Sequence, residues 1–228
     1  MCGRFSLTSR GQRLRQRFGL SAEPDELTPR YNIAPTQPVL VIPNRTQRLL
    51  RPARWGLIPN WAKEASIGNR MINARAETLT SSNVFRDALE LRRCLIPADG
   101  FYEWKREGPK QRTPFYIHSR DGEPFAFAGL WDVWRPRGGD PIASCTIITT
   151  APNELVATLH DRMPVILPPE AYDTWLAPAP LSPEKLMPLL VPYPAEALQA
   201  YAVSSLVNSA NNEEPGCITP LEPQPGGT

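Results

Sequence analysis

Histidine and cysteine are scarce in this chain of 228 residues. It has two histidines and four cysteines, and no two cysteines are close enough to form a Cys-x-x-Cys pair. A structural or catalytic metal centre needs several such ligands at short spacing, and disulfide frameworks belong mainly to much shorter secreted chains. We therefore expect no metal site and no disulfide framework, and nothing in the sequence indicates a cofactor.

Long apolar runs are also missing. No stretch of 18 apolar residues occurs, and no hydrophobic secretory segment follows Met1. The hydrophobic content of 41% and the charged content of 21% are typical of a globular chain. The 27 prolines show no period, which favours many turns and short strands. We predict a soluble cytoplasmic protein with no membrane segment.

Basic residues are few in the second half of the chain. Residues 113–228 contain 5 Lys and Arg against 13 Asp and Glu, whereas residues 1–112 contain 20 against 10. A surplus of charge is often only a solvated surface. An asymmetry this large, carried mostly by arginine, favours an anionic partner near the N-terminal half, and the planar guanidinium suits phosphate.

Periodicity and turn signals predict a strand-rich α+β chain without internal repeats. Helices are expected over residues 9–19, 83–93 and 150–160, near residue 169 and from residue 182. An extended segment is expected over residues 31–35, and strands are expected over residues 39–42, 47–57, 94–97, 101–105, 114–118, 125–131, 143–149, 163–167 and 199–207. No linker divides the chain, so we predict one domain over residues 1–222 and a disordered tail over residues 223–228.

The first five residues read Met1-Cys2-Gly3-Arg4-Phe5. Because cysteine is small, a cell can remove Met1 and leave Cys2 with a free α-amine beside its thiol. These groups titrate near ~8 and ~8.5 in an unperturbed chain, so both are partly reactive at neutral pH. The amine can condense with an aldehyde and the thiol can then close a thiazolidine ring, or the thiol can act as a nucleophile with the amine as base. An ordinary buried cysteine explains this position equally well.

A second candidate site is Asn73-Ala74-Arg75. Residues i and i+2 of a strand share a face, so Asn73 and Arg75 can meet one substrate, the amide at the reacting group and the guanidinium at a phosphate. Taken alone, the segment is explained as well by a turn asparagine and a surface cation.

A third candidate is Glu103, which lies between aromatic residues on a predicted buried strand. Desolvation would raise its pKa and make it a plausible proton shuttle. The alternative is a solvent-facing Glu103 paired with Lys105, which lies on the same face of the strand.

The fourth candidate is His160, which follows a predicted helix and precedes a strand, where loops often present catalytic groups. A capping histidine beside an Asp161–Arg162 ion pair is the structural alternative. Trp55 and Trp61 could stack on unpaired bases, although tryptophan is more often a core residue.

Six segments in this order resemble the SRAP (SOS response-associated peptidase) family of abasic-site processing proteins, and the resemblance spans roughly residues 2–220. They are Met1-Cys2-Gly3-Arg4-Phe5, Tyr31-Asn32-Ile33-Ala34-Pro35, Trp55-Gly56-Leu57-Ile58-Pro59, Asn73-Ala74-Arg75-Ala76-Glu77, Gly100-Phe101-Tyr102-Glu103-Trp104 and His160-Asp161-Arg162. The resemblance implies a barrel-like, mixed or antiparallel sheet with short flanking helices. It also implies a monomer that binds single-stranded DNA, captures the aldehyde of an abasic site as a thiazolidine crosslink and shields the lesion during the DNA damage response.

The resemblance further implies roles for particular residues. Cys2, Asn73, Glu103 and His160 match the family's catalytic positions, and its DNA-binding positions match Gly3, Arg4, Pro35, Trp61, Arg75, Thr149 and Arg162. The family name implies that the chain removes its own Met1, although an aminopeptidase would serve equally, and an abasic-site lyase activity also belongs to this reading.

Two other functions compete with this one. Class II glutamine amidotransferases also begin Met-Cys-Gly, but they need an Asn-Gly pair for the oxyanion hole, and the sequence has none. A non-covalent single-stranded DNA-binding module would explain the basic half and the tryptophans. It gives no reason for Cys2, Glu103 and His160 to occur together.

Overall fold

The computed structural model describes residues 2–24, 26–109 and 111–221, so the predicted tail over residues 223–228 lies outside the described residues. The strands are β1 (Phe5–Leu7), β2 (Arg30–Ile33), β3 (Pro38–Pro43), β4 (Arg51–Trp55), β5 (Asn73–Arg75), β6 (Arg93–Ala98), β7 (Gly100–Arg106), β8 (Arg112–Ser119), β9 (Phe125–Trp134), β10 (Ile142–Thr150), β11 (Met163–Pro164), β12 (Ile166–Leu167) and β13 (Leu198–Ala202). The α-helices are α1 (Gly11–Phe18), α2 (Arg86–Leu91), α3 (Glu154–Ala157), α4 (Tyr172–Trp175) and α5 (Pro183–Leu186). The 3-10 helices are η1 (Ala65–Arg70), η2 (Ala76–Thr78), η3 (Pro169–Ala171), η4 (Met187–Leu189), η5 (Ala195–Ala197), η6 (Ser205–Asn208) and η7 (Pro215–Cys217).

Five strands close into a barrel. β10 pairs with β4, β4 with β3, β3 with β6, β6 with β9, and β9 pairs again with β10. The β4–β10 pairing is parallel and the other four are antiparallel, so the barrel is mixed. The short strands β5 and β11 extend from β10, and β12 extends from β9. Closure removes the free edges that an open sheet of these strands would leave.

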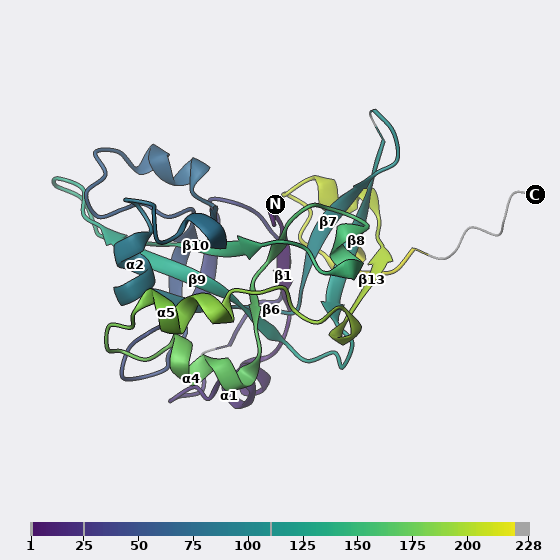
Figure 1. Cartoon of the computed structure of the whole chain (residues 1–228). Coiled ribbons are helices and arrows are strands. Elements are labelled where there is room, and N and C mark those ends of the chain that lie inside the picture. Colours follow the sequence, from purple (N-terminus) through teal and green to yellow (C-terminus); the bar gives the residue numbers. More distant parts are fainter. Residues whose placement is uncertain (1, 25, 110, 222–228) are drawn as a thin grey trace, which may run out of the picture.

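A second sheet has five antiparallel strands in the order β13-β8-β7-β1-β2. Figure 1 shows β7, β8 and β13 on one side of the molecule and the helices α1, α2, α4 and α5 gathered over the barrel, with β1 between the two parts. The ring of Phe5 in β1 packs edge-on against Trp55 of β4 at 5.2 Å and Phe127 of β9 at 5.6 Å between centroids. This aromatic contact joins the second sheet to the barrel.

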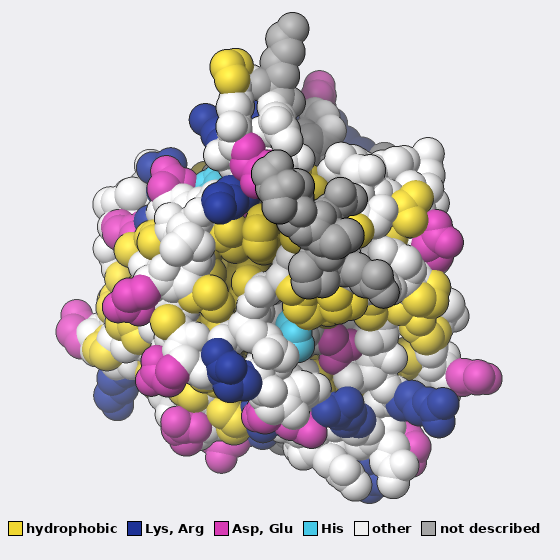
Figure 2. Space-filling view, turned by 90° about the vertical axis from the view of Figure 1, so that its right-hand side faces the viewer, with side chains coloured by type: hydrophobic (Ala, Val, Ile, Leu, Met, Phe, Trp, Pro, Cys, Tyr) yellow, Lys and Arg dark blue, Asp and Glu magenta, His cyan; other side chains and the backbone are white. Residues whose placement is uncertain are grey.

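The surface on the side of β8 and β13 is mixed in character. Figure 2 shows hydrophobic side chains gathered across the middle of that face, with basic and acidic side chains spread around them. No single sign of charge dominates this view.

Helix α1 shows how local sequence sets an element. Its apolar residues Leu14 and Phe18 are buried, four positions apart on one side of the helix. The helix ends at Gly19, whose φ of 61° lies in the left-handed region that glycine adopts without steric cost. The predicted helix over residues 9–19 is confirmed.

Several predicted boundaries are wrong. The last strand was expected over residues 199–207, but β13 ends at Ala202, because the Ser204 hydroxyl caps a 3-10 turn by accepting a hydrogen bond from the Leu206 amide at 3.3 Å. The expected strand over residues 47–57 begins only at Arg51, and the expected helix over residues 83–93 covers only α2. The helix expected over residues 150–160 is shortened to α3, with Asn153 as its N-cap.

Candidate functional site

Cys2 lies where the barrel and the second sheet meet. Its side chain is fully buried, and Gly3 and Arg4 separate it from β1. The Asn73 Nδ2 group, at the start of β5, donates a hydrogen bond to the Cys2 carbonyl at 2.9 Å. Because β5 extends from the barrel and β1 belongs to the second sheet, this bond joins the two parts at Cys2 itself.

Strand β5 carries two residues that the sequence predicts to be functional, Asn73 and Arg75. Asn73 pairs in register with Ile147 of β10 and Arg75 with Thr149. Asn73 Oδ1 is buried and has no hydrogen-bond partner among the described residues, whereas Arg75 is exposed. An unpartnered buried carbonyl oxygen is costly unless a ligand or another group bonds to it.

Glu103 is buried in β7, the strand next to β1, with 3% of its surface exposed. Burial raises its pKa from an ordinary value of 4.5 to about 7. The alternative in which Glu103 faces solvent beside Lys105 is wrong, because only Lys105 is exposed. Burial raises the pKa of the Cys2 thiol, and the negative charge of Glu103 raises it further. The two groups therefore interact electrostatically.

His160 follows α3 and is partly buried. Burial lowers its pKa below the ordinary value of 6.5, which favours the neutral imidazole at neutral pH. The Arg162 amide donates to His160 Nδ1 at 3.1 Å and holds the ring in place.

Arg162, Thr149 and Arg75 form one group. Both Nη atoms of Arg162 donate to the Glu77 carboxylate, at 2.7 and 3.0 Å, and Nη2 also donates to the Thr149 carbonyl at 2.7 Å. The hydrogen bonds from Arg162 lower the pKa of Glu77. Thr149 is fully buried and adjoins Arg75 in the sheet, so the structure brings these three predicted DNA-binding residues together.

Arg4, two residues after Cys2, is held by contacts of its guanidinium. Its Nη1 atom donates to Asn32 Oδ1 and to the Val207 carbonyl, both at 2.6 Å. Its Cζ atom lies 6.0 Å from the centre of the Trp104 ring, which gives a cation–π contact. Gly3 is partly buried between Cys2 and Arg4.

The two candidate tryptophans differ in exposure to solvent. Trp61 is 59% exposed and can stack on a ligand, and Pro35 is partly buried. Trp55 is fully buried, with its indole N–H donating to the Ile72 carbonyl at 2.8 Å. The suggestion that Trp55 stacks on bases is therefore wrong.

A cleft of about 470 Å³ borders the site. His160 and Asp161 line one part of it and Trp104, Lys105 and Arg106 another. Over the described ranges, no group of three or more His, Cys, Asp and Glu side chains could hold a metal ion. In the same part of the chain, no helix is both long and apolar enough to cross a membrane.

The chain belongs to the SOS response associated peptidase (SRAP) family, whose family model matches residues 1–210. The curated relatives include the abasic site processing protein YoqW of Bacillus subtilis (strain 168), which is 49% identical over 221 residues, 96% of this chain and 99% of that protein. The abasic site processing protein HMCES of Pongo abelii is 33% identical over 273 residues, 97% of this chain and 77% of that protein.

Solved structures show the same fold. A crystal structure of a protein from Bacteroides thetaiotaomicron superposes with a TM-score of 0.87 at 27% identity, covering 97% of this chain and 100% of the other. The predicted strand-rich domain with a mixed barrel and short helices is confirmed.

Three residues at the site were not predicted as functional. Asn32 accepts a hydrogen bond from Arg4, Glu213 accepts one from the Asn32 amide, and Glu77 binds Arg162. Asn32 and Glu77 lie inside two of the six family segments, so those segments were a usable signal. Glu213 lies far along the chain, and no local pattern marks it.

Proposed function

We propose that this chain is an abasic-site processing protein that captures the ring-opened aldehyde of an abasic site in single-stranded DNA through Cys2. The observation that carries the proposal is the position of Cys2, with its carbonyl bonded to Asn73 Nδ2 and its thiol near the buried carboxyl group of Glu103. The names of the curated relatives support the same substrate. A monomer suffices for this chemistry.

The reaction requires the α-amine of Cys2, so Met1 is removed first by hydrolysis of the Met1–Cys2 peptide bond. The chain itself or an aminopeptidase can carry out this step. The amine nitrogen then attacks the aldehyde carbon, water leaves and a Schiff base forms. The thiol sulfur adds to the imine carbon while a proton moves to the nitrogen, which closes a thiazolidine ring. The net reaction joins aldehyde and cysteine with loss of one water.

The order of these steps follows from burial. Burial raises the pKa of the Cys2 thiol, which favours the protonated sulfur, and we therefore assign the first attack to the amine. Glu103, with a pKa of about 7, can both accept and donate protons, which suits sugar-ring opening, loss of water and reversal of the crosslink. His160 assists at the sugar oxygen or the imine, and Asn73 holds the N-terminal residue in place.

The residues around Cys2 would bind the phosphates and bases of the DNA. Arg4, Arg75 and Arg162 would bind phosphates on both sides of the lesion, where guanidinium groups form strong charge-assisted hydrogen bonds. Gly3 and Thr149 supply the backbone beside them, and Pro35 and exposed Trp61 would pack against the neighbouring bases. These contacts would hold the reactive sugar against Cys2, where proximity lowers the barrier to capture.

The test is denaturing gel electrophoresis of the mature protein after incubation with single-stranded DNA that holds one abasic site. A heat-stable shifted band is expected, and the Cys2→Ser variant should lose it while keeping salt-sensitive binding. A chain that retains Met1 is the matched control. Hydrolysis of glutamine without a band would favour an amidotransferase, and binding alone would favour a DNA-binding module.

A further inference from the structure

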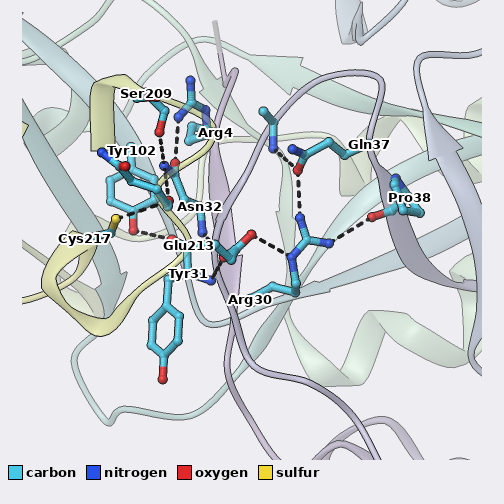
Figure 3. A network of polar contacts seen from close by, with 12 residues as sticks. Arg4, Arg30, Tyr31, Asn32, Gln37, Pro38, Tyr102, Ser209, Glu213 and Cys217 are labelled. Carbon is cyan, nitrogen blue, oxygen red and sulfur yellow. Dashed lines mark hydrogen bonds and ion pairs between the residues drawn. The ribbon is translucent and has the colours of Figure 1, made fainter. Parts of the chain in front are cut away.

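Asn32 is the centre of a polar network that ties the segment 203–217 to the start of the chain (Figure 3). Its side chain is fully buried in β2. Asn32 Oδ1 accepts from Arg4 Nη1 at 2.6 Å, and Nδ2 donates to the carbonyls of Ser209 at 2.9 Å and Asn212 at 2.8 Å. An amide supplies the one acceptor and the two donors that this position uses.

Glu213 belongs to the same segment and attaches it to β2. Its carboxylate accepts hydrogen bonds from the backbone amides of Tyr31 and Asn32, the second at 2.8 Å, and from Arg30 Nε at 2.7 Å (Figure 3). Its side chain remains 31% exposed. Asn32 and Glu213 together clamp the segment 203–217 against β2.

The clamped segment in turn contacts the side chains of Arg4 and Trp104. The Val207 carbonyl and Asn32 Oδ1 both accept from Arg4 Nη1, whereas Nη2 makes no hydrogen bond among the described residues. The Trp104 indole N–H donates to Asn208 Oδ1 at 2.7 Å, and its ring faces the Arg4 guanidinium. Two acceptors thus fix the position of Arg4 Nη1.

We propose that Asn32 is a positioning residue for the contact between Arg4 and a DNA phosphate, and that the segment 203–217 is therefore part of the site. This rests on the proposed function. Without the Asn32 amide, Arg4 Nη1 loses one acceptor, and the carbonyls of Ser209 and Asn212 lose their donor. The guanidinium is then free to leave the orientation that Asn32 Oδ1, the Val207 carbonyl and the Trp104 ring give it.

The experiment compares crosslinking rates for two aldehydes, abasic single-stranded DNA and a small uncharged aldehyde that has no phosphate. Mature wild type, Asn32→Ala, Arg4→Ala and the double variant are measured below their melting temperatures. Asn32→Ala should slow capture of DNA roughly tenfold and leave capture of the small aldehyde unchanged. The double variant should be no slower than Arg4→Ala, because both changes remove one contact.

Two further variants guard against a trivial loss of folding. Asn44→Ala removes another buried asparagine. Its Nδ2 donates to the Leu91 carbonyl at 3.1 Å and its Oδ1 accepts from Trp131, so it shares no hydrogen-bond partner with Arg4. It should lower stability without slowing capture of DNA. Glu213→Ala acts on the clamp from a partly exposed position and should slow capture of DNA selectively.

Equal slowing of both aldehydes, or multiplicative effects in the double variant, would overturn the positioning role. So would unchanged DNA capture by Asn32→Ala and Glu213→Ala when the wild type crosslinks normally. If the wild type captures the small aldehyde but forms no adduct with abasic DNA, the proposed function fails and this inference fails with it.

Discussion

At the scale of residues, the place of Glu103 in the sheet decides its chemistry. β7 lies between β1 and β8, and Glu103 pairs with Phe115 of β8. Neither face of the strand is open to solvent at this point, so desolvation raises the pKa of the carboxyl group to about 7. The same residue on an edge strand would be an ordinary surface acid.

This pKa shift has a consequence for stability. The folded state holds a proton on Glu103 between about pH 4.5 and 7 where the unfolded chain has lost it, so the contribution of Glu103 to stability falls as pH rises through that window. Glu103→Gln has no charge to bury. Its free energy of unfolding should exceed that of the wild type by about 2–4 kcal/mol at pH 8, and the excess should vanish near pH 4.

Urea unfolding at both pH values measures this difference. Glu107→Gln, at an exposed position after the same strand, is the matched control and should show no such change with pH. A Glu103→Gln variant that is equally or less stable than the wild type at pH 8 would contradict a buried carboxyl group with a raised pKa.

Some residue-level features could be predicted from the sequence and others could not. Aromatic neighbours in a strand indicated a buried Glu103 but left a solvent-facing one open, and strand geometry predicted that Asn73 and Arg75 share a face. Asn32 and Glu77 escaped notice because their partners, Arg4 and Arg162, lie 28 and 85 residues away. Such partners are set by tertiary packing, which no local pattern contains.

At the scale of elements, Arg93 ties β6 to two helices. Its guanidinium is fully buried and donates to the carbonyls of Leu89 at 3.0 Å, Trp175 at 2.9 Å and Ala177 at 2.8 Å. Leu89 lies in the last turn of α2 and Trp175 at the end of α4, where helix carbonyls lack intrahelical partners. One side chain therefore caps two helices and attaches both to the barrel.

Arg93→Lys should lower the free energy of unfolding by about 2–4 kcal/mol, because three ammonium donors on a flexible stem cannot replace the planar fork and leave a buried charge poorly bonded. Chemical denaturation measures the change. Arg86→Lys is the control, since Arg86 makes an exposed ion pair with Asp87 and should lose less than about 1 kcal/mol. Equal losses for the two variants would refute the role of Arg93.

The elements themselves were largely predictable. Alternating and continuous apolar runs located the main strands, and the apolar spacing and Gly19 located α1. The errors were at ends, as in the segment 203–207, where apolar residues suggested a strand but the Ser204 hydroxyl starts a turn. The side-chain cap outweighs strand propensity there.

At the scale of the whole molecule, the two oppositely charged halves of the sequence are interleaved in space. β3, β4 and β6 come from the basic half and β9 and β10 from the acidic half, yet all five form one barrel. Ion pairs join the halves: Arg13–Glu123, Arg30–Glu213, Arg48–Asp173, Arg92–Asp132 and Arg162–Glu77. Part of the asymmetry therefore serves internal pairing, which the sequence alone did not reveal, and the mixed surface in Figure 2 agrees with this.

Closure of the barrel could not be predicted from residue patterns, because it depends on contacts between distant parts of the chain. It depends on the parallel pairing of Ser144 and Cys145 with Arg54 and Trp55, and on β9 pairing with both β6 and β10. These pairings are long-range, and only the family resemblance pointed to a barrel. The pairing of β5 with β10 also places Asn73, whose Nδ2 bonds to the Cys2 carbonyl.

The most direct test of the central claim is mass spectrometry of the adduct between the mature chain and an abasic oligonucleotide. After nuclease and protease digestion, the modification should lie on the N-terminal Cys2 peptide, with a mass equal to both components minus one water. It should resist borohydride, because a closed thiazolidine has no imine to reduce. A modification on a lysine, or a Cys2 peptide trapped only after reduction, would contradict capture by amine and thiol together.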